Sequence, residues 1–183
     1  MSLEFSRRSF MKFTALTAVA VAGSSLLSGC DSESALTPSG AFGKKLTVMG
    51  EMTASNPAYA DNTFTCDFTA KCISTNPLAV YGDNFQIVVT GTDSTNSKKK
   101  IVRKYNPKDF GVSFSLSKND YALKKGEEMS SVLTATGITI NAGETVQLMY
   151  FPRKQPTTSN TNGYNYTDLY ATWTGTYKDG SFT

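Results

Sequence analysis

The chain has 183 residues, enough for one folded domain and a targeting segment, and it carries 18 Lys and Arg against 15 Asp and Glu. Three of the basic residues and one acidic residue precede Cys30, so 15 basic and 14 acidic residues remain after it, and we expect no nucleic-acid partner. The sequence has no histidine. This excludes Ser-His and Cys-His nucleophiles and HExxH zinc sites, and we expect neither a cofactor nor a metal ion.

Residues 1–29 have the features of an export signal. Four residues resemble the twin-arginine export motif: Arg7, Arg8, Phe10 and Lys12. The apolar stretch that follows, 13–27, is short and diluted by Thr, Ser and Gly, unlike a membrane-spanning helix of about 20 strongly apolar residues. We therefore predict that 1–29 is a signal peptide.

The sequence Leu-Ser-Gly-Cys at 27–30 resembles the bacterial lipobox. The resemblance implies that diacylglycerol is attached to the thiol of Cys30 and that the chain is cleaved before it; an ordinary cysteine near a cleavage site is the alternative. One acyl chain binds a membrane only marginally, whereas two or more hold it stably. We expect Cys30 to anchor the protein to the extracytoplasmic side of the cell membrane.

Residues 30–43 contain acids, Ser, Pro and Gly without an apolar period. Such a composition is typical of a flexible tether. The sequence thus predicts three parts: a signal peptide at 1–29, a lipidated tether at 30–43 and one folded domain at 44–183.

In the predicted domain, apolar residues recur at every second position in short runs separated by turn residues. This period is typical of an all-β sandwich or barrel with about eight strands. The expected strands cover 46–52, 64–72, 85–89, 101–105, 112–116, 132–140, 146–150 and 169–173. One helical turn at 107–110 is the single candidate for helix.

Cys66 and Cys72 lie six positions apart on the clearest of these strands, on the same face as Phe64 and Phe68. An extended strand places their backbones roughly 20 Å apart. A disulfide requires Cα atoms within about 7 Å. We therefore expect two buried free thiols; a bulge or turn near Asp67 would instead allow a bridge.

The order of the segments resembles the immunoglobulin-like domains of small surface lipoproteins and secreted antigens of Gram-positive bacteria, sometimes described as telokin-like. The matching residues are the Asn76-Pro77 turn before 85–89 and the turn at 142–145 before 146–151. The resemblance implies an immunoglobulin-like antiparallel β-sandwich of about seven to eight strands, roles in adhesion or envelope contact, and no catalytic set. Trp173 departs from the antibody pattern because it falls in the last expected strand without a cysteine pair beside it.

The densest basic cluster consists of Lys98, Lys99, Lys100, Arg103, Lys104 and Lys108. It could contact acidic headgroups or wall polymers. The favoured interpretation is a solvated hairpin whose lysines protect an edge strand.

The segment 156–170 is the longest polar stretch of the domain and contains Tyr164, Tyr166 and Tyr170. Tyrosine offers rigid contact area with a polar tip, and sandwich loops commonly carry binding sites. We regard these tyrosines as the best binding surface that the sequence offers; a hairpin loop whose tyrosines cap the sandwich edge is the alternative.

The acidic residues lack the spacing of a calcium loop, and adjacent Glu127 and Glu128 would face opposite sides of a strand. A glycosidase-like carboxylate pair from distant segments stays open. The sequence favours a non-enzymatic binding or structural module of the cell envelope, with a polymer, glycan or protein as partner. The alternative is an exported enzyme or a cofactor carrier.

Overall fold

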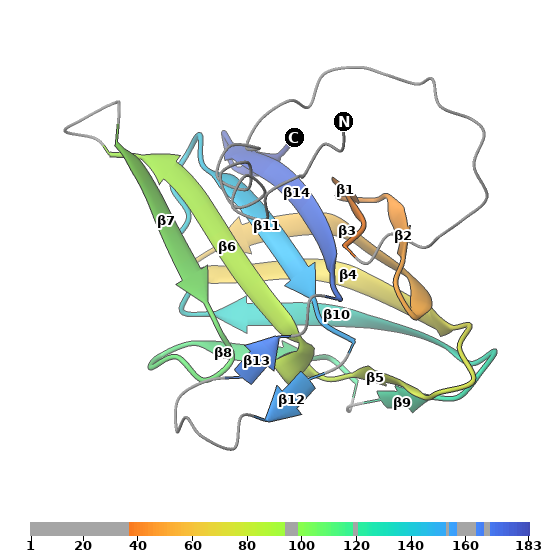
Figure 1. Cartoon of the computed structure of the whole chain (residues 1–183). Coiled ribbons are helices and arrows are strands. Elements are labelled where there is room, and N and C mark those ends of the chain that lie inside the picture. Colours follow the sequence, from red (N-terminus) through yellow and green to blue (C-terminus); the bar gives the residue numbers. More distant parts are fainter. Residues whose placement is uncertain (1–36, 94–98, 119–120, 153, 157–163, 167–168) are drawn as a thin grey trace, which may run out of the picture. The chain divides into compact units, whose positions relative to one another are not determined.

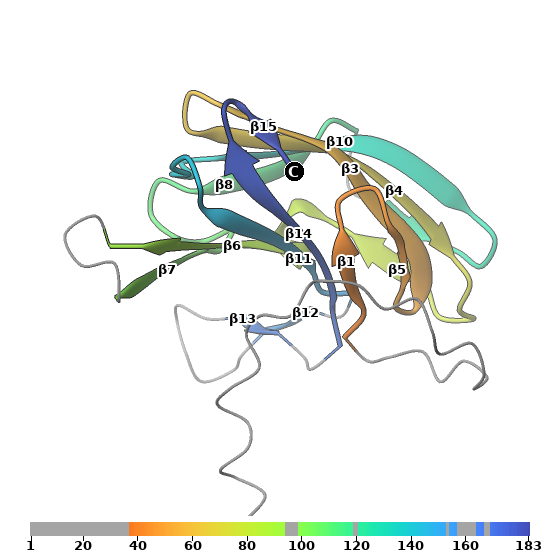
Figure 2. The same cartoon turned by 90° about the horizontal axis from the view of Figure 1, so that it is seen from above.

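The computed structural model describes residues 37–93, 99–118, 121–152, 154–156, 164–166 and 169–183. The side chains of residues 121, 154–156 and 164–166 are outside this description. In this part of the chain the regular structure is strand, apart from one 3-10 turn at Gly82–Asn84. Two sheets face each other (Figures 1 and 2), which confirms the predicted all-β sandwich.

The first sheet has the order β1-β14-β11-β6-β7, with β15 added to β14. Its strands are β1 (Ser39–Ala41), β6 (Phe85–Thr92), β7 (Lys100–Tyr105), β11 (Thr145–Tyr150), β14 (Ala171–Lys178) and β15 (Ser181–Phe182). All neighbours are antiparallel except β1 and β14, which run parallel. β1 and β7 therefore occupy the two ends of the strand order.

The second sheet has the order β2-β3-β4-β10-β8, and every pair in it is antiparallel. Its strands are β2 (Lys45–Thr47), β3 (Gly50–Ala60), β4 (Thr63–Cys72), β8 (Ser113–Leu116) and β10 (Glu128–Thr136). Two short pairs complete the described strands: β5 (Leu78–Val80) with β9 (Tyr121–Leu123), and β12 (Lys154–Pro156) with β13 (Tyr164–Tyr166).

The core lies between the two sheets and is centred on Phe68 of β4. Its ring meets Phe85 edge-on at a centroid distance of 4.9 Å and Trp173 edge-on at 5.9 Å. Trp173 is fully buried, and its Nε1 donates a 2.8 Å hydrogen bond to the carbonyl of Lys44. Phe68 belongs to the second sheet, and Phe85 and Trp173 belong to the first, so these ring contacts join the two sheets. Edge-to-face pairs add to the free energy gained by burying such large rings.

Cys66 and Cys72 both lie on β4, point into the core and are free thiols, as predicted. The alternation of β4 is continuous from Phe64 to Cys72, so no bulge in this strand brings the two sulfurs together. Burial raises the pKa of the Cys66 thiol well above its ordinary value, with a smaller contribution from Asp67. This thiol therefore stays protonated and inert at neutral pH.

Several expected strand boundaries are wrong. The expected strand 46–52 is two strands, β2 and β3, because a tight turn intervenes in which Met49 has a φ of 57°. The expected strand 132–140 ends at Thr136. Gly137 follows with a φ of 77°, a conformation that ends the extended strand and favours glycine. A Cβ at this residue would lie 2.0 Å from the carbonyl oxygen of Gly111.

The segment 106–112 is a hydrogen-bonded turn in place of the expected helical turn at 107–110. The amide of Asp109 donates to the carbonyl of Asn106, and the amide of Val112 donates to that of Asp109. Neither bond continues into a helical ladder among these residues.

The last residues of the predicted tether at 30–43 belong to the folded domain. β1 pairs with β14, and Phe42 packs against Phe64 and Phe182 at centroid distances of 6.1 and 5.9 Å. The segment shows no apolar period because β1 has only three residues and no large side chain. The folded part therefore begins at Ser39 or before it, in contrast to the expected boundary at residue 44.

Candidate binding groove

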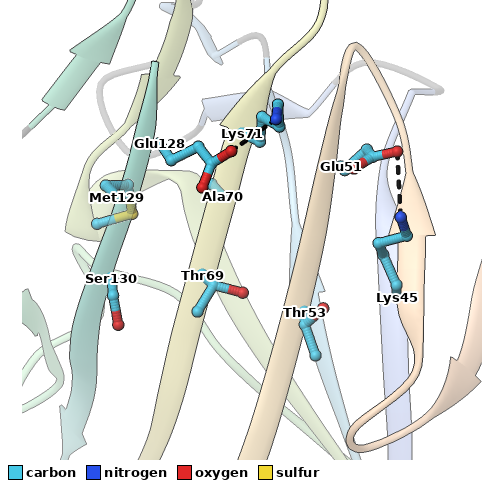
Figure 3. A pocket seen from close by; sticks show the side chains of 9 residues that line it. All are labelled: Lys45, Glu51, Thr53, Thr69, Ala70, Lys71, Glu128, Met129 and Ser130. Carbon is cyan, nitrogen blue, oxygen red and sulfur yellow. Dashed lines mark ion pairs between the residues drawn. The ribbon is translucent and has the colours of Figure 1, made fainter. Parts of the chain in front are cut away.

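The strongest candidate site is a groove of about 480 Å³ on the outer face of the second sheet. It follows from the alternation of β4, which points Phe68 and Cys72 inward and Thr69 and Lys71 outward. The groove is lined by Lys45, Glu51, Thr53, Thr69, Ala70, Lys71, Glu128, Met129 and Ser130 (Figure 3).

The strand register places the polar lining residues in two rows. Thr53 of β3 is opposite Thr69 of β4, and Thr69 is opposite Ser130 of β10, which makes a row of three hydroxyl side chains. In the second row Lys71 of β4 lies between Glu51 and Glu128, its partners on the neighbouring strands. Figure 3 shows both rows, each of which runs across the three strands β3, β4 and β10.

Two ion pairs lie beside the hydroxyl row, both on the side of the second row. Lys45 Nζ lies 3.2 Å from Glu51 Oε1, and Lys71 Nζ lies 2.6 Å from Glu128 Oε1. The hydrogen bond with Glu128 raises the pKa of Lys71, so this lysine stays charged at neutral pH. Exposed pairs of this kind contribute little to stability. Their effect is to give the groove alternating charge with equal numbers of each sign.

Glu51 and Glu128 are a carboxylate pair from distant segments, which is the arrangement that the sequence left open. They stand two strand spacings apart, about 10 Å. Each carboxylate is paired with a lysine. The pair supplies hydrogen-bond acceptors for a ligand in the groove. Glu127 points elsewhere and accepts a 2.8 Å hydrogen bond from the amide of Lys124.

The predicted tyrosine surface is described only in part. Tyr164 and Tyr166 lie on β13, and their side chains are outside the described residues. Tyr170 is half-buried, and its ring packs on that of buried Phe151 at 5.4 Å. Tyr170 is thus at least partly a packing residue, and the binding role of the other two tyrosines remains a prediction.

The predicted basic cluster does not form one patch. β7 is an edge strand, as expected, and its exposed lysines Lys100 and Lys104 face solvent from it. Lys99 pairs with Asp93 at 3.4 Å at the hairpin end of the strand, whereas Lys108 lies in the turn beyond its other end. Lys98 is outside the described residues.

Arg103 of this cluster faces the opposite side of β7 and pairs with Glu144, whose side chain is 8% exposed. Burial alone would raise the pKa of Glu144, but hydrogen bonds from the amide of Asn141 and from Arg103 hold it below its ordinary value. Arg103 is therefore a structural residue. Sequence reasoning missed this because Glu144 lies 41 positions away.

Cys30 and the export-motif residues Arg7, Arg8, Phe10 and Lys12 lie outside the described residues. In the described part of the chain, no three or more Cys, Asp and Glu side chains gather in a way that could hold a metal ion. The same residues contain no helix of the length and apolarity needed to cross a membrane.

No family model matches the chain, and no curated protein matches it. Among solved structures, the chain is similar to the yjhA protein from Bacillus subtilis, with 12% sequence identity and a TM-score of 0.41. That similarity covers 74% of this chain and 98% of the other. At these values the likeness carries no argument about function.

Proposed function

We propose that this protein is a lipid-anchored module of the cell envelope that binds a hydroxyl-rich polymer, such as an envelope glycan, without transforming it. The observation that carries the binding role is the row of Thr53, Thr69 and Ser130 hydroxyls beside two ion pairs in an open groove. The resemblance of residues 27–30 to a lipobox and of the N-terminus to a twin-arginine signal supports the anchor and the envelope location.

The chemistry of the groove favours an uncharged or zwitterionic polar ligand. Threonine and serine hydroxyls both donate and accept hydrogen bonds, lysines donate, and carboxylates accept. Sugars present the same mixture of donors and acceptors. Because the charges of both signs are balanced, the groove offers no net attraction to a strongly charged polymer.

The shape of the groove favours an extended ligand. Its lining residues come from four adjacent strands, β2, β3, β4 and β10, which together span about 14 Å across the sheet. This span suits a few sugar units of a chain that crosses the strands. The sheet supplies a rigid support because both neighbours of β4 pair with it along most of its length.

The test uses isosteric variants on the neighbouring strands β3 and β4. Thr53→Val and Thr69→Val together remove two hydroxyls from the groove and retain β-branched shape. Each lost hydrogen bond contributes about 0.5–1.5 kcal/mol, so the affinity for a glycan found on an envelope-polymer array should fall roughly 5- to 150-fold. The matched control is Thr65→Val, which faces the same side of β4 outside the groove lining. The control should bind like the unaltered protein.

Equal affinity of the double variant and the control would contradict the groove assignment.

The array also tests the tyrosine surface, through Tyr164→Ala combined with Tyr166→Ala. If binding is lost only in that variant, the ligand site lies on β13. Thermal unfolding midpoints should be the same for the groove variant and its control, because all three threonines face outward from the core.

A further inference from the structure

Phe110 is the most exposed large apolar residue of the described chain, at 107% of the reference value for its type. It lies in the turn 106–112 between β7 and β8. The turn is well determined by hydrogen bonds, so this exposure does not result from a loosely held chain.

Hydrogen bonds between Asn106 and Asp109 hold the turn in one conformation. The carboxylate of Asp109 accepts hydrogen bonds from the amide of Asn106 at 2.7 Å and from its Nδ2 at 3.1 Å. Gln86 of β6 donates to Asn106 Oδ1 at 2.5 Å, which ties the turn to the sheet. The backbone of Gly111 then lies against that of Gly137. The turn therefore presents the Phe110 ring to solvent in a prepared conformation, which lowers the entropic cost of docking it.

This turn lies at the same end of the first sheet as the point where the chain enters the domain. The register gives one row across the sheet, from Ser39 to Thr172, Met149 and Gln86, and the Gln86 side chain reaches Asn106. Four strand spacings, about 19 Å, separate Ser39 from Asn106 along this row. The pair of Thr92 and Lys100, where β6 ends and β7 begins, lies at the other end of the sheet (Figure 1).

Nine positions separate Cys30 from Ser39. A stretch of that length spans at most about 30 Å in any conformation. A lipid anchor at Cys30 therefore keeps the Ser39 end of the sheet near the bilayer. The turn that carries Phe110 is at this end, within reach of the same surface.

The basic residues close to Phe110 in the sequence also fit a membrane. Lys104 on β7 and Lys108 in the turn are both exposed, and both lie within six positions of Phe110. Asp109, the acidic residue of the turn, directs its carboxylate to Asn106. An aromatic ring flanked by lysines is the combination that binds the interface of an anionic bilayer.

We propose that the Phe110 turn docks in the headgroup region of the membrane and gives the anchored domain a fixed orientation. This inference rests on the proposed anchor at Cys30. In the docked state the Phe110 ring leaves water and Lys104 and Lys108 face anionic headgroups. The groove on the outer face of the other sheet is not part of this contact.

The experiment measures depth in the bilayer with single tryptophans. The chain has one native tryptophan, Trp173, which is fully buried and serves as the constant background. The lipidated mature protein is prepared as Phe110→Trp and, as the matched control at the opposite end of the sheet, as Thr92→Trp, an exposed position of β6. Both are placed in vesicles containing anionic phosphatidylglycerol, with and without bromine-labelled acyl chains.

The emission of Phe110→Trp should shift to shorter wavelength and lose at least half of its added intensity with brominated lipid, while Thr92→Trp and the unaltered protein change little. Equal quenching of the two variants, or none in either, would overturn the proposal. A shift in native membranes without quenching by brominated lipid would mean that a protein covers Phe110, and the lipid proposal would fail. Mass spectrometry of Cys30 distinguishes a failure of the docking proposal from a failure of the anchor proposal. An acylated but unquenched protein refutes only the docking, whereas an unacylated Cys30 refutes the anchor as well.

Discussion

Replacing Glu144 with Ala should destabilise the domain far more than any change in its exposed ion pairs. The Glu144 carboxylate accepts hydrogen bonds from Arg103, from the amide of Asn141 at 2.7 Å and from Asn141 Nδ2 at 3.2 Å. The side chains of Glu144 and Arg103 are 8% and 26% exposed. The variant thus leaves a partly buried guanidinium and a backbone amide without their acceptor.

The magnitude follows from these contacts. Removing one partner of a fully buried pair costs about 3–5 kcal/mol, and the partial exposure of Arg103 reduces this to about 3 kcal/mol for Glu144→Ala. Glu144→Gln retains one acceptor oxygen and loses the charge and the second acceptor, so about half of that loss is expected. For a domain of this size, 3 kcal/mol corresponds to a fall of about 10 °C in the unfolding midpoint.

Urea unfolding of the purified protein, followed by Trp173 fluorescence, measures these differences. The matched control is Glu128→Ala, which breaks an exposed pair with Lys71 and should leave the midpoint nearly unchanged. A loss in Glu144→Ala no larger than that in Glu128→Ala would refute the assignment of Arg103 as a structural residue. The slope of the unfolding curve should stay the same in all variants.

Three further predictions concern the same domain. Since the pKa of Glu144 is lowered on folding, its contribution is fully present above its unfolded value near 4.5 and is lost as pH falls through the folded value, so the stability difference between Glu144→Gln and the unaltered protein should shrink in urea titrations below about pH 4. Thiol titration of the denatured protein without reductant should find Cys66 and Cys72 free, and a Cys66–Cys72 bridge in mass spectra would show that β4 is broken between them. Gly137→Ala should lower the free energy of unfolding by at least about 2 kcal/mol, because a Cβ at this positive φ would meet the Gly111 carbonyl oxygen; an unchanged urea midpoint would mean that the turn relaxes freely.

The alternation of apolar residues was sufficient to predict the sandwich and the central strand. In β4 every second residue is buried, so the sequence alone gives the inward direction of Phe68 and Cys72 and the outward direction of Thr69. The short strand β1 was not predictable in this way, because its pairing partner Trp173 and its neighbours on β14 lie more than 130 positions away.

The groove could not be predicted from the sequence because it depends on register. Thr53, Thr69 and Ser130 belong to three strands, and no local pattern shows that they stand in one row. The different surroundings of the basic residues on β7 have a related cause: neighbours in sequence alternate between the two faces of a strand. Lys104 and Arg103 therefore have different surroundings, one in solvent and one beside Glu144.

The most direct test of the account is fatty-acid labelling of Cys30→Ala beside the unaltered protein in the cells that produce it. We predict that the unaltered protein incorporates labelled fatty acid and sediments with membranes, and that Cys30→Ala carries no label and leaves the membrane fraction or remains uncleaved. Label of equal intensity on Cys30→Ala, or none on the unaltered protein, would contradict a lipid-anchored module of the cell envelope.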